Sequence, residues 1–227
     1  MLHFGLIAFP NLTQLDLTAP LEVFTRFPNS HVSIIAEKLE PITSEKGFKF
    51  LPDTTFETTK PVDVIFVPGG SGVDAAMENK KLISFLCNQA CHAQYITSVC
   101  TGALILAHAG LLDGYKATSH WLSLDLLRLF PKVKVVAKRV VVDGNRITGG
   151  GVTAGIDMAL VLAEKIYGLE LAQSIQLMIE YNPKPPFKSG SPKTAPSKIV
   201  EKIKTERKAI QEKRRKLIEK LLNIPLV

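Results

Sequence analysis

The sequence lacks long apolar runs, an export signal and paired cysteines. None of the apolar runs in its 227 residues reaches the ~18 residues of a membrane-spanning helix, so no membrane span is expected. The N-terminal stretch Met1–Pro10 lacks the basic start and cleavage site of a signal peptide and is expected to form a buried strand. The three cysteines, an odd number without an export signal, predict free thiols in the reducing cytoplasm.

Net positive charge is also absent outside one segment. The chain carries a formal charge of +7, from 28 lysines and arginines and 21 acidic residues. Between residues 193 and 220, eleven basic residues face four glutamates, which leaves seventeen of each sign elsewhere. The basic character therefore belongs to the C-terminal segment, and the neutral remainder argues against nucleic acid as a partner.

What the chain does contain is 46% hydrophobic residues, enough for one sizeable core. Apolar, β-branched runs alternate with helical ones along residues 1–181. The alternation predicts an α/β domain with a mainly parallel sheet and helices on both faces. Strands are expected at residues 2–9, 31–36, 62–67, 95–99, 132–136, 139–142 and 146–148, a hairpin at 41–51, and helices near 16–24, 79–93, 121–130, 153–167 and 169–179.

Residues 182–227 differ in composition from the rest. Five prolines between residues 182 and 197 predict an extended, semi-rigid strap. A long basic helix is expected from Lys198 to about Leu222, with a narrow apolar stripe that includes Ile199 and Leu217. The strap and the stripe together predict a homodimer clasped by this region.

The stretch Tyr95–Leu106 reads as a strand-to-helix elbow that carries a nucleophile. An apolar run ends at Cys100, small residues stand two positions before and after it, and an apolar helical run follows. This spacing resembles a G-x-S-x-G elbow, in which strand and helix approach closely around a strained residue. The N-terminus of the helix is expected to favour thiolate over thiol at Cys100. The alternative is an inert cysteine on a core strand.

A cysteine nucleophile needs a proton partner and donors for developing negative charge. Asp16 is the acid/base candidate, since a carboxyl group beside a thiol in an apolar pocket can stay partly neutral at pH 7. The alternative for Asp16 is a helix N-cap, and Pro20 is expected in the first turn of the same helix. The backbone of Gly69 and Gly70 could point N–H groups at the site, together with that of Thr101. The Gly69–Gly70 stretch could equally be a tight turn.

Other polar residues are less specific. His120 could complete a Cys–His pair with Cys100 or bond to backbone. Cys87 and Cys91 lie four apart on one predicted helix and read as core positions without nearby metal ligands. The sequence therefore implies no metal and no cofactor.

Four motifs together resemble the ThiJ/PfpI superfamily, which has the class I glutamine-amidotransferase-like fold. They are Val67-Pro-Gly-Gly70, Thr97-Ser-Val-Cys-Thr-Gly-Ala103, the stretch Gly110–Trp121 and the stretch Ile147–Asp157. Within this superfamily the chain is most similar to the isocyanide hydratases. The resemblance implies Cys100 as nucleophile, Asp16 as general acid/base, Thr101 as support for Asp16, and Gly69, Gly70 and Gly150 as backbone contacts to substrate.

The resemblance implies a lyase that adds water to an isocyanide and releases an N-formamide through a covalent thioimidate. Departures from other branches favour this choice: a late His-x-Glu pair is absent, Thr101 replaces the histidine of the PfpI peptidases, and Asp16 stands where glyoxalase branches use Glu. The alternative function is a redox sensor or regulator that uses oxidation of Cys100 and the basic helix. Regulators of this group append a DNA-binding domain of ~100 residues, which the ~45 residues after the core cannot supply.

Overall fold

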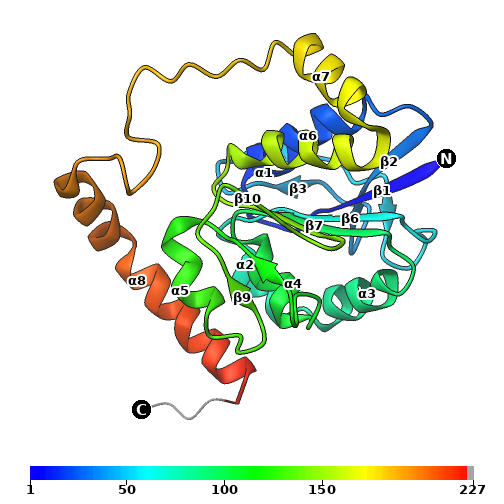
Figure 1. Ribbon diagram of the computed structural model, residues 1–227. Helices are drawn as coiled ribbons and strands as arrows, with labels where there is room; N and C mark the ends of the chain where they lie inside the picture. Colours follow the sequence, from blue (N-terminus) through cyan, green and yellow to red (C-terminus); the bar gives the residue numbers. More distant parts are fainter. Residues whose placement is uncertain (224–227) are drawn as a thin grey trace.

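The computed structural model describes residues 1–223 of the chain and is built around a twisted seven-stranded sheet (Figure 1). Neighbouring strands are parallel except β10 and β11, which are antiparallel. The predicted mainly parallel sheet is therefore confirmed. Its strands, in spatial order, are β10 (Val140–Asp143), β11 (Arg146–Gly149), β7 (Tyr95–Val99), β6 (Val64–Val67), β1 (Leu2–Ile7), β2 (Ser30–Ala36) and β5 (Thr54–Thr55).

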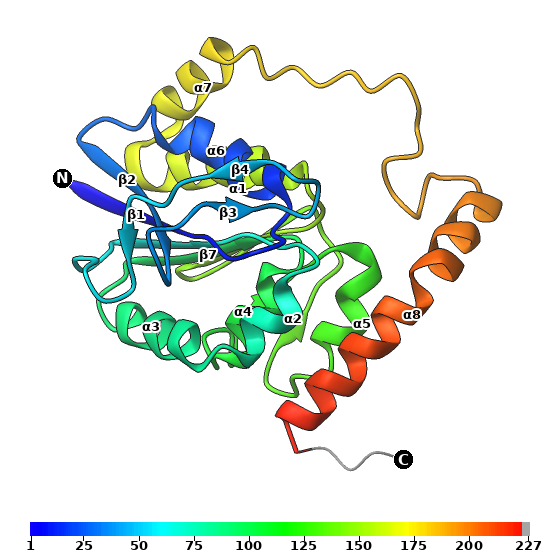
Figure 2. The same cartoon turned by 180° about the vertical axis from the view of Figure 1, so that it is seen from behind.

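Helices cover both faces of the sheet, as Figures 1 and 2 show from opposite sides. One layer holds α1 (Gln14–Phe24), α6 (Ala154–Tyr167) and α7 (Leu169–Met178); the other holds α2 (Val73–Glu78), α3 (Lys80–Ala90), α4 (Gly102–His108) and α5 (Leu124–Leu127). The central strand β6 is buried along its whole length, as expected for a parallel strand with helices on both sides. This layering brings the carboxyl ends of β1, β6 and β7 to one edge of the sheet.

Several short elements differ from the predicted pattern. The hairpin forms from β3 (Ile42–Thr43) and β4 (Lys49–Phe50), as expected. The strands β8 (Lys116–Ala117) and β9 (Lys134–Val135) pair with each other outside the main sheet. The predicted helix over 121–130 is a 3-10 turn, η1 (Trp121–Ser123), followed by α5. Helix α2 was not anticipated, because six residues after a glycine-rich loop carry too little periodicity.

The start of α1 also corrects the sequence prediction. The helix begins at Gln14, so Asp16 lies in its first turn as expected, but Pro20 lies in the second turn and not in the first. The ring of Pro20 packs against α6. A Cβ atom at Gly155 would lie 2.9 Å from Pro20 Cγ, so only glycine allows this close approach of the two helices.

The C-terminal region leaves the sheet and returns along the other helical layer. Residues 182–196 form the predicted strap, which is extended except for a turn at residues 192–194, and α8 (Ser197–Leu221) follows it (Figure 1). Helix α8 packs against α5 and η1 and buries Val200 and Ile218. The last four residues of the predicted C-terminal region, 224–227, lie outside the residues that the structure describes. Within residues 1–223, no helix combines the length and apolar character needed to cross a membrane.

Candidate active site

Cys100 occupies a strained elbow between β7 and α4, as the sequence predicts. Its φ of 54° lies in the left-handed region, which is costly for a residue with a Cβ atom. Two hydrogen bonds hold it there: its N–H donates to the Gly149 carbonyl (3.1 Å), and its carbonyl accepts from Ser119 Oγ (2.8 Å). A Cβ at Gly102 would lie 2.2 Å from the Val67 carbonyl oxygen, so glycine is required where strand and helix approach.

Asp16 reaches this elbow from the first turn of α1 and is fully buried. It is not the N-cap, which is Thr13. Burial raises the pKa of Asp16 to about 7, against the opposing effects of the Gly69 N–H and the Cys100 thiol. Among the described residues, Asp16 Oδ1 has no hydrogen-bond partner. The carboxyl group can therefore exchange a proton at neutral pH and has one oxygen available to do so.

The Cys100 thiol is the other half of this pair. Burial and then the negative charge of Asp16 raise the pKa of Cys100 well above its ordinary range, while the Thr101 N–H acts in the opposite direction. The predicted preference for thiolate is therefore wrong for this buried site, because desolvation outweighs the short helix α4. Burial and the nearby carboxyl group both disfavour negative charge on the Cys100 sulfur.

The glycine loop after β6 positions Asp16 through its backbone. Gly69 N–H donates to Asp16 Oδ2 (2.9 Å), and Gly70 N–H donates to Thr101 Oγ1 (3.0 Å). A Cβ at Gly69 would lie 2.5 Å from the Thr101 nitrogen and 2.9 Å from Asp16 Oδ2, so a side chain would block the site. The loop is thus more than a tight turn, because it joins three of the predicted site residues.

The predicted oxyanion donors have other partners. The N–H of Gly150 donates to the Arg139 carbonyl (2.8 Å), and those of Gly69 and Gly70 are engaged as described above. The hydroxyl of Thr101 contacts Gly70 and not Asp16 directly. Thr101 therefore supports Asp16 only through the glycine loop, and its own N–H is the backbone donor directed at the Cys100 sulfur.

Glu45 belongs to the site but carried no recognisable signal in the sequence. It lies between β3 and β4, where its carboxylate accepts from Thr13 Oγ1 (3.0 Å) and from the Ser71 N–H (3.3 Å). Its negative charge adds to the rise in the pKa of Asp16. Ser119 was missed in the same way. Both residues act through tertiary contacts that no local motif encodes.

Of the two roles predicted for His120, a pair with Cys100 or a hydrogen bond to backbone, the structure shows the hydrogen bond to backbone. Among the described residues its ring makes one hydrogen bond, in which Nδ1 accepts from the Leu122 N–H (3.3 Å) at the start of η1. Burial lowers the pKa of His120, and the charges of Arg207 and Arg214 lower it further, which favours a neutral ring. Cys87 is half-buried and Cys91 is exposed, and both are free thiols. Nowhere in residues 1–223 do three or more metal-ligating side chains gather at one place.

Two clefts lie near the carboxyl edge of the sheet. The larger, of about 700 Å³, lies beyond β1 and β2, and its wall includes Phe9, Glu37 and Ile42 but neither Cys100 nor Asp16. The smaller, of about 440 Å³, is lined by Ser119, Gly150 and the strap residues Gly190–Lys193, among others, and its wall likewise includes neither Cys100 nor Asp16. Ser119 joins the smaller cleft to the elbow, because its hydroxyl donates to the Cys100 carbonyl (2.8 Å).

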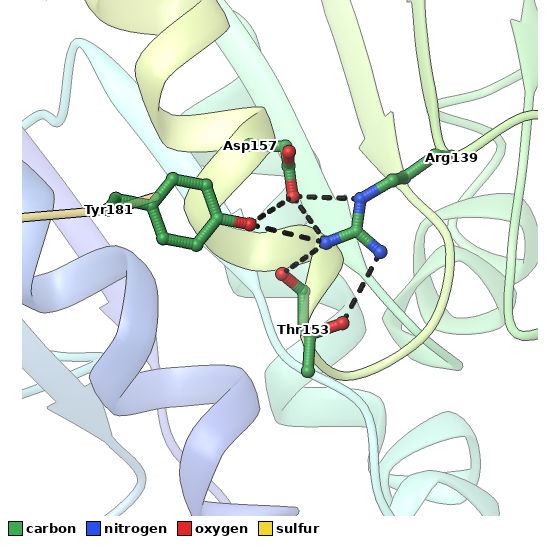
Figure 3. A network of polar contacts seen from close by, with 4 residues as sticks. All are labelled: Arg139, Thr153, Asp157 and Tyr181. Carbon is green, nitrogen blue, oxygen red and sulfur yellow. Dashed lines mark hydrogen bonds and ion pairs between the residues drawn. The ribbon is translucent and has the colours of Figure 1, made fainter. Parts of the chain in front are cut away.

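A polar network beside this cleft secures the start of the strap (Figure 3). Arg139 Nε donates to Asp157 Oδ2 (2.8 Å), Arg139 Nη2 donates to the Thr153 carbonyl (3.0 Å), and the Tyr181 hydroxyl donates to Asp157 Oδ2 (3.0 Å). The same Arg139 accepts the Gly150 N–H at its carbonyl. The network therefore links the strap, α6 and the glycine turn that borders the elbow.

Fold and site together define an α/β protein with a cysteine at a strained strand-to-helix elbow and a buried carboxyl group beside it. Residues 5–165 match the model of the DJ-1/PfpI family, and the chain belongs to this family. The predicted ThiJ/PfpI membership is thus confirmed.

Three relatives illustrate the range of the family. The chain is 49% identical to an isonitrile hydratase of Pseudomonas putida over 89% of both chains, which confirms the predicted similarity to lyases of the isocyanide hydratase kind. The crystal structure of a ThiJ/PfpI family protein from Pseudomonas syringae has a TM-score of 0.92 and 39% identity, and the match covers 95% of this chain and 90% of that one. The transcriptional regulator GbdR of Pseudomonas aeruginosa is 35% identical over 62% of this chain and 38% of its own length.

Proposed function

We propose that this protein hydrates isocyanides (R–N≡C) to N-formamides through a covalent adduct on Cys100. The observation that carries the proposal is the pairing of a strained cysteine with a buried carboxyl group whose pKa is raised to about 7. A group with this pKa both accepts and returns a proton at neutral pH. The 49% identity to an isonitrile hydratase supports the same reaction.

In the first half of the proposed reaction, the Cys100 sulfur attacks the terminal isocyanide carbon. Asp16 takes the thiol proton and delivers it to that carbon, which acquires negative charge as the sulfur adds. A C–S bond and a C–H bond form, and the product is the thioimidate R–N=CH–S–Cys100. The Thr101 N–H stabilises the sulfur while its charge develops.

In the second half, Asp16 removes a proton from water as the oxygen attacks the thioimidate carbon, and it gives that proton to the nitrogen. The tetrahedral adduct then collapses. Its C–S bond breaks, the hydroxyl proton returns through Asp16 to the sulfur, and R–NH–CHO leaves. The first half needs a proton donor to the carbon, and the second half needs a proton donor to the nitrogen. Neither half depends mainly on hydrogen-bond donors to a negatively charged oxygen. The engagement of the Gly69, Gly70 and Gly150 N–H groups elsewhere is compatible with this chemistry.

The cleft beside the elbow is the proposed route for the substrate. Trp121, Leu124 and Val152 contribute apolar surface to its wall. An uncharged isocyanide with an apolar R group suits such a surface, because little desolvation opposes its entry. The proposed substrate class is therefore apolar alkyl and aryl isocyanides, with water as the second reactant.

The decisive experiment offers an aryl isocyanide to the purified protein and follows N-formamide by mass spectrometry. Wild type is expected to turn over, and Cys100→Ala is expected to lose activity completely. Asp16→Asn is expected to lose about 10²- to 10⁴-fold in kcat, as for removal of a general acid/base. If hydrolysis is the slower half in this variant, Cys100 gains the mass of one substrate molecule.

Cys91→Ala is the matched control, because Cys91 is a free and exposed thiol at the C-terminal end of α3. It is expected to retain wild-type turnover. Either of two results rules the proposal out: no formamide from wild type with any alkyl or aryl isocyanide, or undiminished turnover by Cys100→Ala.

The alternative function is a regulator, which the similarity to GbdR favours. Two observations weigh against it. The raised pKa of the buried Cys100 opposes the thiolate that oxidation requires. The exposed bases of α8 are interleaved with acids in the ion pairs Lys202–Glu206, Lys204–Glu201, Lys208–Glu212 and Arg215–Glu219, which is typical of a solvated helix face.

The regulator alternative predicts salt-dependent binding to DNA that weakens when exposed bases of α8 are removed. Deletion of residues 198–227 is unsuitable for this test, because it would uncover the core around Ile218. We expect no salt-dependent binding by wild type in a fluorescence anisotropy titration. Binding that Lys204→Gln with Lys208→Gln weakens would support the regulator instead.

A further inference from the structure

Helix α8 contains one buried charge. Eleven basic residues lie between residues 193 and 220. Among the basic residues of α8, only Arg214 is buried, with 4% of its side chain exposed; its neighbours Lys213 and Lys216 are exposed. The helix lies along α5 on the side of the molecule that also holds α2 (Figure 2). Arg214 therefore points inward from the helix toward the glycine loop.

The guanidinium of Arg214 makes two contacts there. Its Nε forms an ion pair with Asp74 in the first turn of α2, and its Nη2 donates to the Gly70 carbonyl (3.4 Å). A planar guanidinium can serve two acceptors at fixed angles, which an ammonium group cannot do. The contact links residues 144 positions apart in the chain.

Gly70 is the residue through which this contact reaches the site. Its own N–H holds Thr101 Oγ1, and the N–H of the preceding Gly69 holds Asp16 Oδ2. The φ of Gly70 is +139°, in the region open to glycine, so no side chain limits its rotation. The Gly70 carbonyl also accepts from the Thr101 hydroxyl (3.4 Å) and the Val73 N–H (3.5 Å), and among these donors only Arg214 carries a charge.

We propose that Arg214 is a positioning residue for the Cys100–Asp16 pair: by holding the Gly70 carbonyl, it keeps the Gly69 N–H on Asp16. The proposal explains why a solvated basic helix buries one arginine at the loop. Its geometric part is independent of the proposed hydratase function, and only the turnover readout below rests on that function.

The proposal predicts the direction of a pH effect. The groups acting on the Asp16 carboxyl are Cys100 on the elbow, Glu45 on the hairpin and the Gly69 N–H, of which only the thiol and the N–H lower its pKa. Loss of the Arg214 contact loosens the Gly69 N–H, so the pKa of Asp16 rises. Less carboxylate is then available near pH 7 to accept the Cys100 proton.

The test measures alkylation of Cys100 by iodoacetamide against pH, with the three cysteine peptides resolved by mass spectrometry. In Arg214→Gln, the pH at which Cys100 alkylation reaches half its maximum is expected to increase by roughly half a pH unit or more. With an isocyanide substrate, kcat is expected to fall about threefold near pH 7, in proportion to the smaller fraction of carboxylate, while KM changes less than twofold. Arg214→Lys keeps the charge beside Asp74 and is expected to remain folded yet still show the shifted profile.

Two controls separate positioning from simple structural support. Arg207→Gln removes the same charge from the same helix at an exposed position and is expected to leave the profile unchanged. Ile218→Ala weakens the packing of α8 and is expected to lower the urea midpoint without shifting the profile. An unshifted profile in both Arg214→Gln and Arg214→Lys, with only a lower urea midpoint, would overturn the proposal.

The alkylation readout also separates the two proposals of function and positioning. A shifted Cys100 profile without isocyanide turnover by wild type supports the role of Arg214 and refutes the hydratase. Turnover by wild type with unshifted Arg214 variants supports the hydratase and refutes the role of Arg214.

Discussion

The buried carboxyl group of Asp16 destabilises the folded protein when it is ionised, and the same burial raises its pKa into the range that the proposed chemistry requires. A carboxyl group whose pKa is raised on folding binds more protons in the folded than in the unfolded state between the two pKa values. Its contribution to stability is therefore intact below the unfolded value of 3.8 and is lost as the pH rises toward about 7. Above that pH, a buried carboxylate is present at its full desolvation cost.

Asp16→Asn is expected to remove this cost while its amide oxygen still accepts from Gly69. Over the roughly three units between the two pKa values, the loss in the wild-type free energy of unfolding reaches up to about 4 kcal/mol. Urea unfolding of both proteins at pH 4 and pH 8 measures it. The variant is expected to lose less stability than wild type over this interval, and parallel losses would contradict the raised pKa.

At the scale of elements, the site depends on how closely β6, β7 and α4 approach. Gly102→Ala would place a Cβ 2.2 Å from the Val67 carbonyl oxygen and 2.7 Å from that of Pro68, and neither backbone atom can move easily. We expect a loss of about 3 kcal/mol in the free energy of unfolding, at the upper end for overpacking.

Gly190→Ala is the matched control for that substitution. Gly190 lies in the strap, where an added Cβ atom would meet no heavy atom within 4 Å, and its φ is not positive. The free energy of unfolding of this variant is expected to stay within about 0.5 kcal/mol of wild type. Equal stability of the two variants in urea titrations would show that the elbow is less tightly packed than the structure indicates.

At the scale of the whole molecule, exposed apolar residues support the predicted homodimer. Leu177 and Met178 at the end of α7 and Phe187 in the strap are 81%, 69% and 76% exposed. Part of the apolar stripe of α8, by contrast, packs against its own chain through Leu217 and Ile218. We therefore propose that the dimer surface is formed mainly by α7 and the strap, with a smaller contribution from α8.

Light scattering at micromolar concentration tests the dimer. The mass of one chain is 24.9 kDa, and wild type is expected to elute at twice this mass. Leu177→Glu combined with Phe187→Ser is expected to shift the mass toward one chain, because charge at a buried interface is costly. A monomeric wild type would rule the dimer out.

The sequence alone determined the order of the elements and the nucleophile elbow. Alternating apolar runs sufficed for a mainly parallel sheet, and the small residues around Cys100 sufficed for the turn, because both are encoded by residues close together in the chain. The carboxyl ends of parallel strands meet at one edge, so Asp16, Gly69 and Cys100 could be grouped before their contacts were known.

Only the tertiary structure decided how these residues are protonated and held. The partners of the Gly69, Gly70 and Gly150 N–H groups, the charge of Glu45 near Asp16 and the burial of Arg214 against Gly70 all join segments far apart in sequence. In the sequence Arg214 is one base among many on a helix that reads as solvated. Burial and long-range charge depend on which surfaces pack together, and no local pattern of residue types specifies that.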